Sequence, residues 1–160
     1  MLELYAAPCA TLHLDPETGV MRFTRTEVPY ASNAEMAAIH AQIGRVLDRH
    51  GRDRHTLLVD MRRAVMNNDP SFEQAAARAR SILVRGFSRV AVLVQTAVGA
   101  LQVKRHVQHD GLSIPVLSSE ALALELLTGS VDADHAPPSS GQRTWAPPSS
   151  SRAVPRPRRR

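Results

Sequence analysis

Few side chains in this chain combine the residue types and spacing that chemistry requires. Asp60 ends the apolar run 56–60, which reads as a buried strand, and ligands gather outside the carboxyl ends of parallel strands. A phosphoacceptor aspartate or a ligand-sensing cleft would use this position; the simpler interpretation is a carboxylate that accepts backbone N–H bonds. His106 and His109, with Asp110 adjacent, share a face of a predicted helix, but no third metal ligand has matching spacing. We therefore expect no metal site.

The remaining candidate groups favour structural roles. Cys9 is the only cysteine, so a disulfide framework and a multi-cysteine zinc site are excluded, and a small core-strand residue is expected. His40 lies on or beside an apolar helical stripe, which is typical of a packed core histidine. The sequence lacks phosphate-binding glycine loops, a nucleophile elbow and a His-Glu-x-x-His motif. We therefore expect no catalytic residue and no cofactor, and hence no enzyme.

The elements that must position these residues begin with a hairpin. Residues 10–14 alternate between apolar and polar, the segment 15–19 has turn chemistry, and residues 20–28 resume a strand that Pro29 closes. Ser32 and Glu35 form a capping-box pattern that starts a helix, and Gly51 ends it. The apolar stripe of that helix comprises Met36, Ile39, Ile43, Val46 and Leu47.

Strands and helices then alternate. The run 90–94 predicts a second strand covered on both faces, and 114–117 predicts an edge strand because Pro115 cannot donate to a ladder. Three more helices are expected: one after Asn68 or Asp69, one after Thr96, and one after Ser118 or Ser119. The expected buried residues of the first of these helices are Phe72, Ala75, Ala76, Ala79, Ile82 and Leu83. Those of the second are Val98, Leu101 and Val107, and those of the third are Leu122, Leu126 and Leu127. Arg78, Arg80 and Arg85 lie elsewhere on the first helix and are expected in solvent. This order predicts an α/β fold: a single mixed sheet, with an N-terminal antiparallel hairpin plus parallel strands, and about four helices.

Composition divides the 160 residues into two parts. Residues 1–129 are long enough for one domain, and residues 130–160 are rich in proline, serine and arginine with few aliphatic side chains. We expect the second part to be a disordered tail. The net charge of +5 belongs mostly to the tail, which has six arginines against two aspartates. The absence of a long apolar run and of a secretory signal pattern makes a cytoplasmic protein the default expectation.

The order of elements over residues 8–128 resembles the STAS superfamily, most closely its SpoIIAA-like branch of anti-sigma-factor antagonists. The resemblance rests on the hairpin around 15–19, the block 56–62, the helix after Pro70 and the strand 89–94. It implies a regulatory or adaptor module that binds a kinase, an anti-sigma factor or another regulator. In the family, a serine that opens the helix after the third strand is phosphorylated by a partner kinase. Here that stretch is 67–71, which has no Ser-Gly pair, and Ser71 is the candidate phosphosite.

Two surfaces are candidates for binding partners. The segment 61–72 is where the family meets its partners, and its proposed partner-binding residues are Arg62, Arg63, Asn67, Asn68 and Asp69. The alternative is electrostatic association of the tail with nucleic acid or another polyanion, which is unspecific and salt-dependent. The tail residues proposed for it are Arg152, Arg156, Arg158, Arg159 and Arg160.

Overall fold

The computed structural model describes residues 1–65, 67 and 69–129. Its elements, in chain order, are β1 (Leu2–Ala7), β2 (Ala10–Leu14), β3 (Val20–Arg25), α1 (Asn33–Arg49), the 3₁₀ turn η1 (Arg52–Arg54), β4 (Thr56–Asp60), α2 (Pro70–Val84), β5 (Val90–Leu93), α3 (Ala97–His109), β6 (Val116–Leu117) and α4 (Glu120–Thr128). None of the described helices is long and apolar enough to cross a membrane. The expected tail disorder and the boundary at residue 129 concern a segment outside the described residues.

The strands form one mixed sheet in the order β1-β2-β3-β4-β5-β6. The pairs β1–β2 and β2–β3 are antiparallel, and β3, β4, β5 and β6 run parallel to one another. Because the strand order never reverses, right-handed crossovers place α1, α2 and α3 on the same face. The predicted α/β class with an antiparallel hairpin followed by parallel strands is confirmed.

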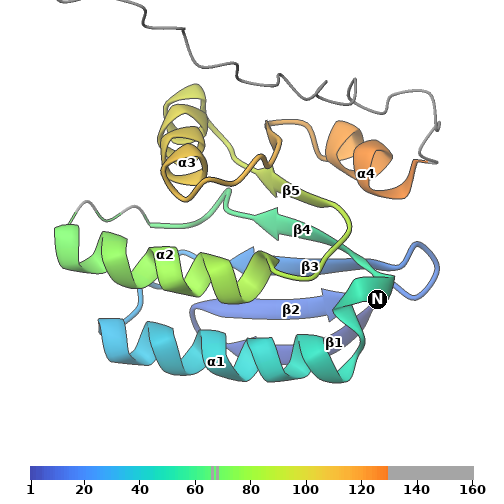
Figure 1. Cartoon of the computed structure of the whole chain (residues 1–160), viewed down its shortest axis with the longest axis horizontal. Helices are drawn as coiled ribbons and strands as arrows, with labels where there is room; N and C mark the ends of the chain where they lie inside the picture. Colours follow the sequence, from blue (N-terminus) through green and yellow to red (C-terminus); the bar gives the residue numbers. More distant parts are fainter. Residues whose placement is uncertain (66, 68, 130–160) are drawn as a thin grey trace, which may run out of the picture. The chain divides into compact units, whose positions relative to one another are not determined.

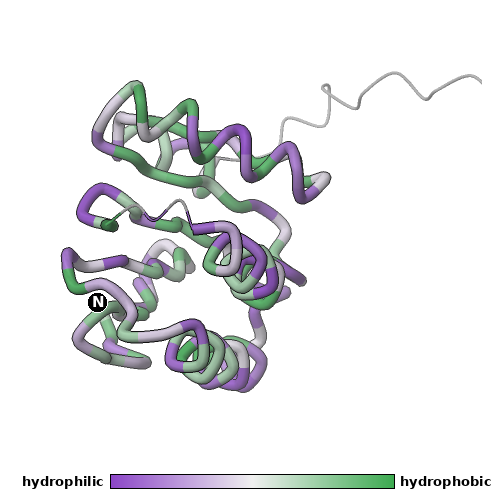
Figure 2. Tube along the Cα trace, turned by 90° about the vertical axis from the view of Figure 1, so that its left-hand side faces the viewer, coloured by the Kyte–Doolittle hydropathy of each residue, from purple (hydrophilic) through white to green (hydrophobic). Residues whose placement is uncertain are grey.

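Each face of the sheet has its own apolar core. Side chains alternate along the strands, so Phe23, Val59 and Val92 face α1, α2 and α3 in adjacent register positions. Leu58, Ala91 and Leu93 face the opposite way and pack with Ala123 and Leu127 of α4. Figure 1 shows α1 and α2 side by side along the sheet, and Figure 2 shows hydrophobic and hydrophilic residues mixed along their turns, as expected for helices with one packed face.

Helix starts follow the predicted capping chemistry. Ser32 accepts a hydrogen bond from the Glu35 backbone at 3.1 Å, and the Glu35 side chain reaches back to Ala31 rather than to Ser32 itself. Thr96 and Ser119 cap α3 and α4 in the same way. These side chains satisfy backbone N–H groups of the first helical turn, which have no partner within the helix.

The structure corrects four sequence-based expectations. A strand, β1, precedes the predicted hairpin and pairs with β2. On α3, Val107 is buried as predicted, but Val98 and Leu101 are exposed. Ala100 and Val103 pack in their place, because the packed face is turned away from the predicted stripe. On α4, Leu122 and Leu126 are exposed, and Ala123 packs instead. Arg80 is not left to solvent but pairs with Asp110, their Nε and Oδ2 atoms 2.7 Å apart.

Candidate functional site

Four charged side chains meet at the carboxyl end of β4, on the face covered by α4. Asp60 is buried, and its Oδ2 atom lies 2.6 Å from Nη2 of Arg62 and 3.5 Å from Nη1 of Arg22. Glu120, the first residue of α4, pairs with both arginines, with 2.9 Å between its Oε2 atom and Nη2 of Arg62. We call these four residues the charge cluster. It connects the first turn of α4 to two neighbouring strands.

The charge cluster keeps both of its acids ionised. Burial on its own would raise the pKa of Asp60, but the hydrogen bonds from Arg62 and the charges of Arg62 and Arg22 outweigh burial, so that pKa lies below its ordinary value. The hydrogen bond from Arg22 lowers the pKa of Glu120, and burial opposes it. Asp60 also accepts a hydrogen bond from the Arg62 backbone at 3.2 Å. The interpretation of Asp60 as a carboxylate that accepts N–H bonds at a strand end is confirmed.

The residues predicted for partner binding lie in separate settings. Arg62 belongs to the charge cluster, and Arg63 is exposed and pairs with Glu27. Asn67 accepts a hydrogen bond from the Asp69 backbone at 2.9 Å. Asn68 and the five tail arginines lie outside the described residues. Arg62 and Asn67 are five positions apart in the sequence but lie on different faces of the sheet. Arg62 pairs with Glu120 of α4, whereas Asn67 lines a cavity on the other face.

Asp69 and Ser71 form the start of α2. The Asp69 carboxylate accepts hydrogen bonds from the backbone N–H groups of Ser71 and Phe72, at 2.8 and 3.1 Å. The Ser71 hydroxyl donates to the same carboxylate and accepts from Asn33 at 3.3 Å. Ser71 is exposed, and it takes part in the helix cap rather than pointing freely into solvent. Its role as a phosphosite stays a prediction.

The two histidines considered as metal ligands pair with different acids. His106 lies 3.0 Å from Glu73 of α2, measured from Nδ1 to Oε2, and His109 lies 3.7 Å from Asp110. Among the residues that the structure describes, no group of three or more His, Cys, Asp or Glu side chains is placed to hold a metal ion. Cys9 and His40 are buried in the core, as predicted.

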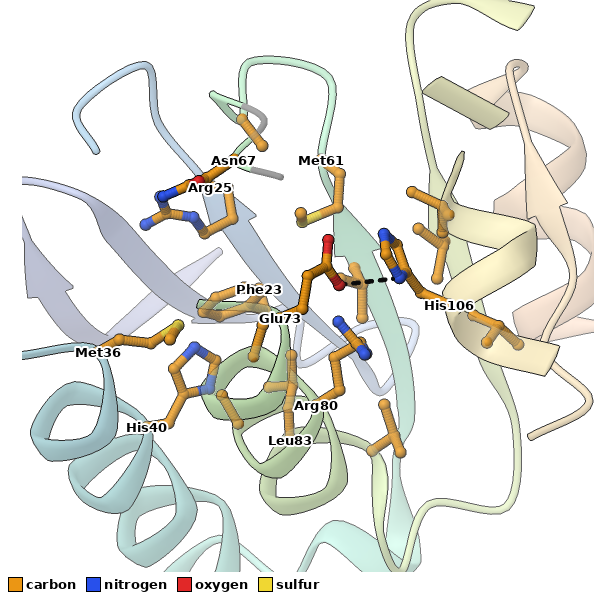
Figure 3. Close-up of a pocket in the computed structure, with 18 of the residues that line it drawn as sticks. Phe23, Arg25, Met36, His40, Met61, Asn67, Glu73, Arg80, Leu83 and His106 are labelled. Atoms are coloured by element: carbon orange, nitrogen blue, oxygen red, sulfur yellow. Dashed lines mark ion pairs between the residues drawn. The ribbon is translucent and has the colours of Figure 1, made fainter. Parts of the chain in front are cut away.

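A cavity of about 140 Å³ lies between α2 and α3, on the face of the sheet opposite the charge cluster (Figure 3). Its lining is mostly apolar and comes from three strands, three helices and the loop after β4. The described lining residues are Phe23, Arg25, Tyr30, Met36, His40, Val59, Met61, Ala64, Val65, Asn67, Phe72, Glu73, Ala76, Ala79, Arg80, Leu83, Val84, Val92, Val103, His106, Val107, Leu112 and Ile114. Since Val65 and Asn67 are exposed, the cavity reaches solvent on the loop side.

Three polar side chains form a linked group at one end of the cavity. Arg25 donates to the backbone carbonyl of Cys9 and stacks on Tyr30, with 3.8 Å between its guanidinium carbon and the ring centroid. The Tyr30 hydroxyl lies 2.9 Å from Nε2 of His40. Burial raises the pKa of Tyr30 to about 12 and, with the charge of Arg25, lowers the pKa of His40 to about 4. Tyr30 and His40 are therefore both uncharged near neutral pH.

Sequence reasoning did not find this cavity or the role of Arg25. Its polar groups come from β3, the segment after it, α1, α2 and α3, so that only the sheet order brings them together. The one available signal was an arginine among apolar residues on the inward-facing positions of a predicted strand. No family model matches the chain, and no curated protein or solved structure is similar to it at the level required for a match.

Proposed function

We propose that this chain is a non-enzymatic regulatory or adaptor module that acts in the cytoplasm through protein–protein contact, as its resemblance to STAS domains implies. The observation that carries the proposal is a pair of apolar stripes that α3 and α4 leave in solvent. On α3, Val98 and Leu101 are 74% and 70% exposed. On α4, Leu122 and Leu126 are 56% and 41% exposed.

The spacing of these side chains makes each pair a continuous strip. Residues three or four positions apart are neighbours on a helix surface, so Val98 lies beside Leu101 and Leu122 beside Leu126. Both helices lie at the β6 end of the strand order (Figure 1): α3 contacts β6 on one face of the sheet, and α4 contacts β5 and β6 on the other face. Grouped exposed apolar side chains of this kind mark contact surfaces, because a partner that covers them removes apolar area from water.

The neighbouring edge strand offers backbone groups to the same partner. β6 has only two residues and pairs with β5 on one side, so its other side lies at the end of the sheet. An unpaired strand edge beside apolar helices suits a partner that adds both main-chain hydrogen bonds and apolar contacts. The side of the sheet at β6 is therefore the surface that we assign to the partner.

The proposal is tested by the retention of partners on the immobilised full-length chain in a lysate of the source organism. The variant that combines Leu101→Glu and Leu126→Glu should lose a protein that the wild type retains. Because both side chains are exposed, the substitutions should change the free energy of unfolding by no more than about 0.5 kcal/mol. A thermal melt of each variant checks this.

Leu2→Glu is the matched control, since Leu2 is 53% exposed on β1, at the opposite edge of the sheet. It should retain the same protein as the wild type. A second variant, Arg63→Ala with Asn67→Ala, tests the segment 61–72 in the same assay without touching the charge cluster. If every protein retained by the wild type is also retained by the Leu101→Glu, Leu126→Glu variant, the assigned surface is wrong.

A further inference from the structure

We propose that the cavity between α2 and α3 binds a small apolar carboxylate about the size of one aromatic ring, with the carboxylate against Arg25. This proposal does not depend on the proposed function, because the cavity and the exposed stripes of α3 and α4 consist of different residues.

The size and walls of the cavity define the apolar part of the ligand. The floor is formed by Phe23, Val59 and Val92, and apolar side chains such as Leu83 and Val103 form the sides. Its volume of about 140 Å³ is close to that of an engineered apolar cavity of about 150 Å³ that binds benzene. A single ring or a short branched chain therefore fits, and a long acyl chain does not.

The charge of Arg25 defines the polar part of the ligand. Arg25 is only 5% exposed, and it makes no ion pair with any acid of the described residues. Its two hydrogen bonds go to uncharged backbone carbonyls, those of Cys9 and Val28. A guanidinium carries five N–H donors, and a buried cation without a counter-charge is unfavourable. A ligand carboxylate would supply that counter-charge.

The other charged groups on the wall already have partners. Glu73 lies 3.0 Å from His106, measured from Oε2 to Nδ1, and the charge of Arg80 is offset by Asp110. Glu73 is the single carboxylate of the described lining, and Figure 3 shows it beside His106, while Arg25 lies across the cavity above Phe23. An anion at Arg25 is therefore separated from the acid on the opposite side.

One further feature prepares the Arg25 end. Tyr30 stacks on the face of the guanidinium, which leaves the edge of its plane for the bidentate contact that carboxylates prefer.

The experiment measures binding of benzoate and of benzyl alcohol to the full-length chain by titration calorimetry or by ligand-observed NMR. The two probes share the ring and differ in the carboxylate. Benzoate should bind at least about tenfold more tightly, since a charge-assisted contact to a buried arginine is absent for the alcohol. Equal affinity would overturn the assignment of a carboxylate, and no binding of either probe would overturn the site.

Two variants locate the binding. Ala76→Leu fills the cavity from α2 and should abolish binding of both probes, while Ala38→Leu, at an exposed position of α1, should leave both affinities unchanged. Arg25→Met should remove the preference for benzoate but keep the binding of benzyl alcohol. If Arg25→Met does not fold, the proposal is decided by the preference of the wild type for benzoate over benzyl alcohol and by the affinity of the Ala76→Leu variant for both probes. Unchanged benzoate binding by folded Ala76→Leu would contradict the proposed location.

Discussion

Glu73 of α2 and His106 of α3 meet beside the cavity, with 3.0 Å between Oε2 and Nδ1. A second pair, Arg80 and Asp110, joins α2 to the residue that follows α3, about two helical turns further along α2. Two polar pairs therefore connect α2 to the end of α3 above the sheet, and Glu73, Arg80 and His106 all line the cavity.

Replacing Glu73 with Gln should weaken the connection between α2 and α3 only slightly. The Glu73 side chain is 29% exposed, and solvent-screened pairs contribute no more than about 1 kcal/mol to the free energy of unfolding. Urea denaturation of the wild type and of Glu73→Gln measures the difference. If the substitution lowers the free energy of unfolding by more than about 2 kcal/mol, the pair contributes more than a solvent-screened pair can, and our interpretation is wrong.

Replacing Asp60 with Asn should destabilise the protein by about 3 kcal/mol at pH 7, because the variant leaves Arg22 and Arg62 without a buried partner. The pKa of Asp60 is lowered, so its contribution is present above its ordinary value of 3.8 and is lost as the pH falls through the lower value of the folded state. The stability difference between the wild type and Asp60→Asn should therefore shrink in acid. A difference that is small at pH 7, or that stays constant down to pH 2, contradicts this account.

His40 should make the protein less stable in mildly acidic solution. Burial and the charge of Arg25 lower the pKa of His40 from 6.5 to about 4. Between these two pH values, His40 is protonated in the unfolded state but not in the folded state. The contribution is therefore complete above pH 6.5 and declines below it, by about 2 kcal/mol between pH 7 and pH 5. The stability difference between the wild type and His40→Gln, measured at the two pH values, should change by that amount. Identical pH profiles would show that His40 is not buried in its neutral form.

The tail arginines give a separate prediction. If residues 130–160 bind nucleic acid, changing Arg152, Arg156, Arg158, Arg159 and Arg160 to Gln should abolish retention on DNA and RNA at low salt, because the contacts are electrostatic. Filter binding at two salt concentrations measures this. Equal retention by the wild type and by the variant would end the polyanion interpretation.

Local patterns allowed most elements to be predicted from the sequence, and the reasons are visible at individual residues. The uninterrupted apolar run before Asp60 predicted β4 with its observed bounds, since a strand covered on both faces needs no alternation. Capping residues predicted where α1 and α3 begin. β1 was missed because an edge strand whose register shifts between Glu3 and Tyr5 has a weak alternating pattern.

The contacts between helices could not be predicted in the same way. Val98 and Leu101 fit a buried stripe by spacing alone, yet the direction from which α3 approaches the sheet places Ala100 and Val103 inward. Arg80 pairs with Asp110 because the end of α3 lies near α2. That proximity follows from the order of the strands in the sheet and not from the local sequence. The cavity depends on the same relationship, so its polar residues carry no common signal in the sequence.

Site-specific photo-crosslinking in cells of the source organism tests the central claim, that the surface of α3 and α4 binds a protein partner, most directly. A photoreactive amino acid replaces Leu101 or Leu126 in the full-length chain, and Leu2, exposed at the opposite edge, provides the control. We expect a discrete crosslinked product from positions 101 and 126 that position 2 does not give. The same background at all three positions would contradict the account.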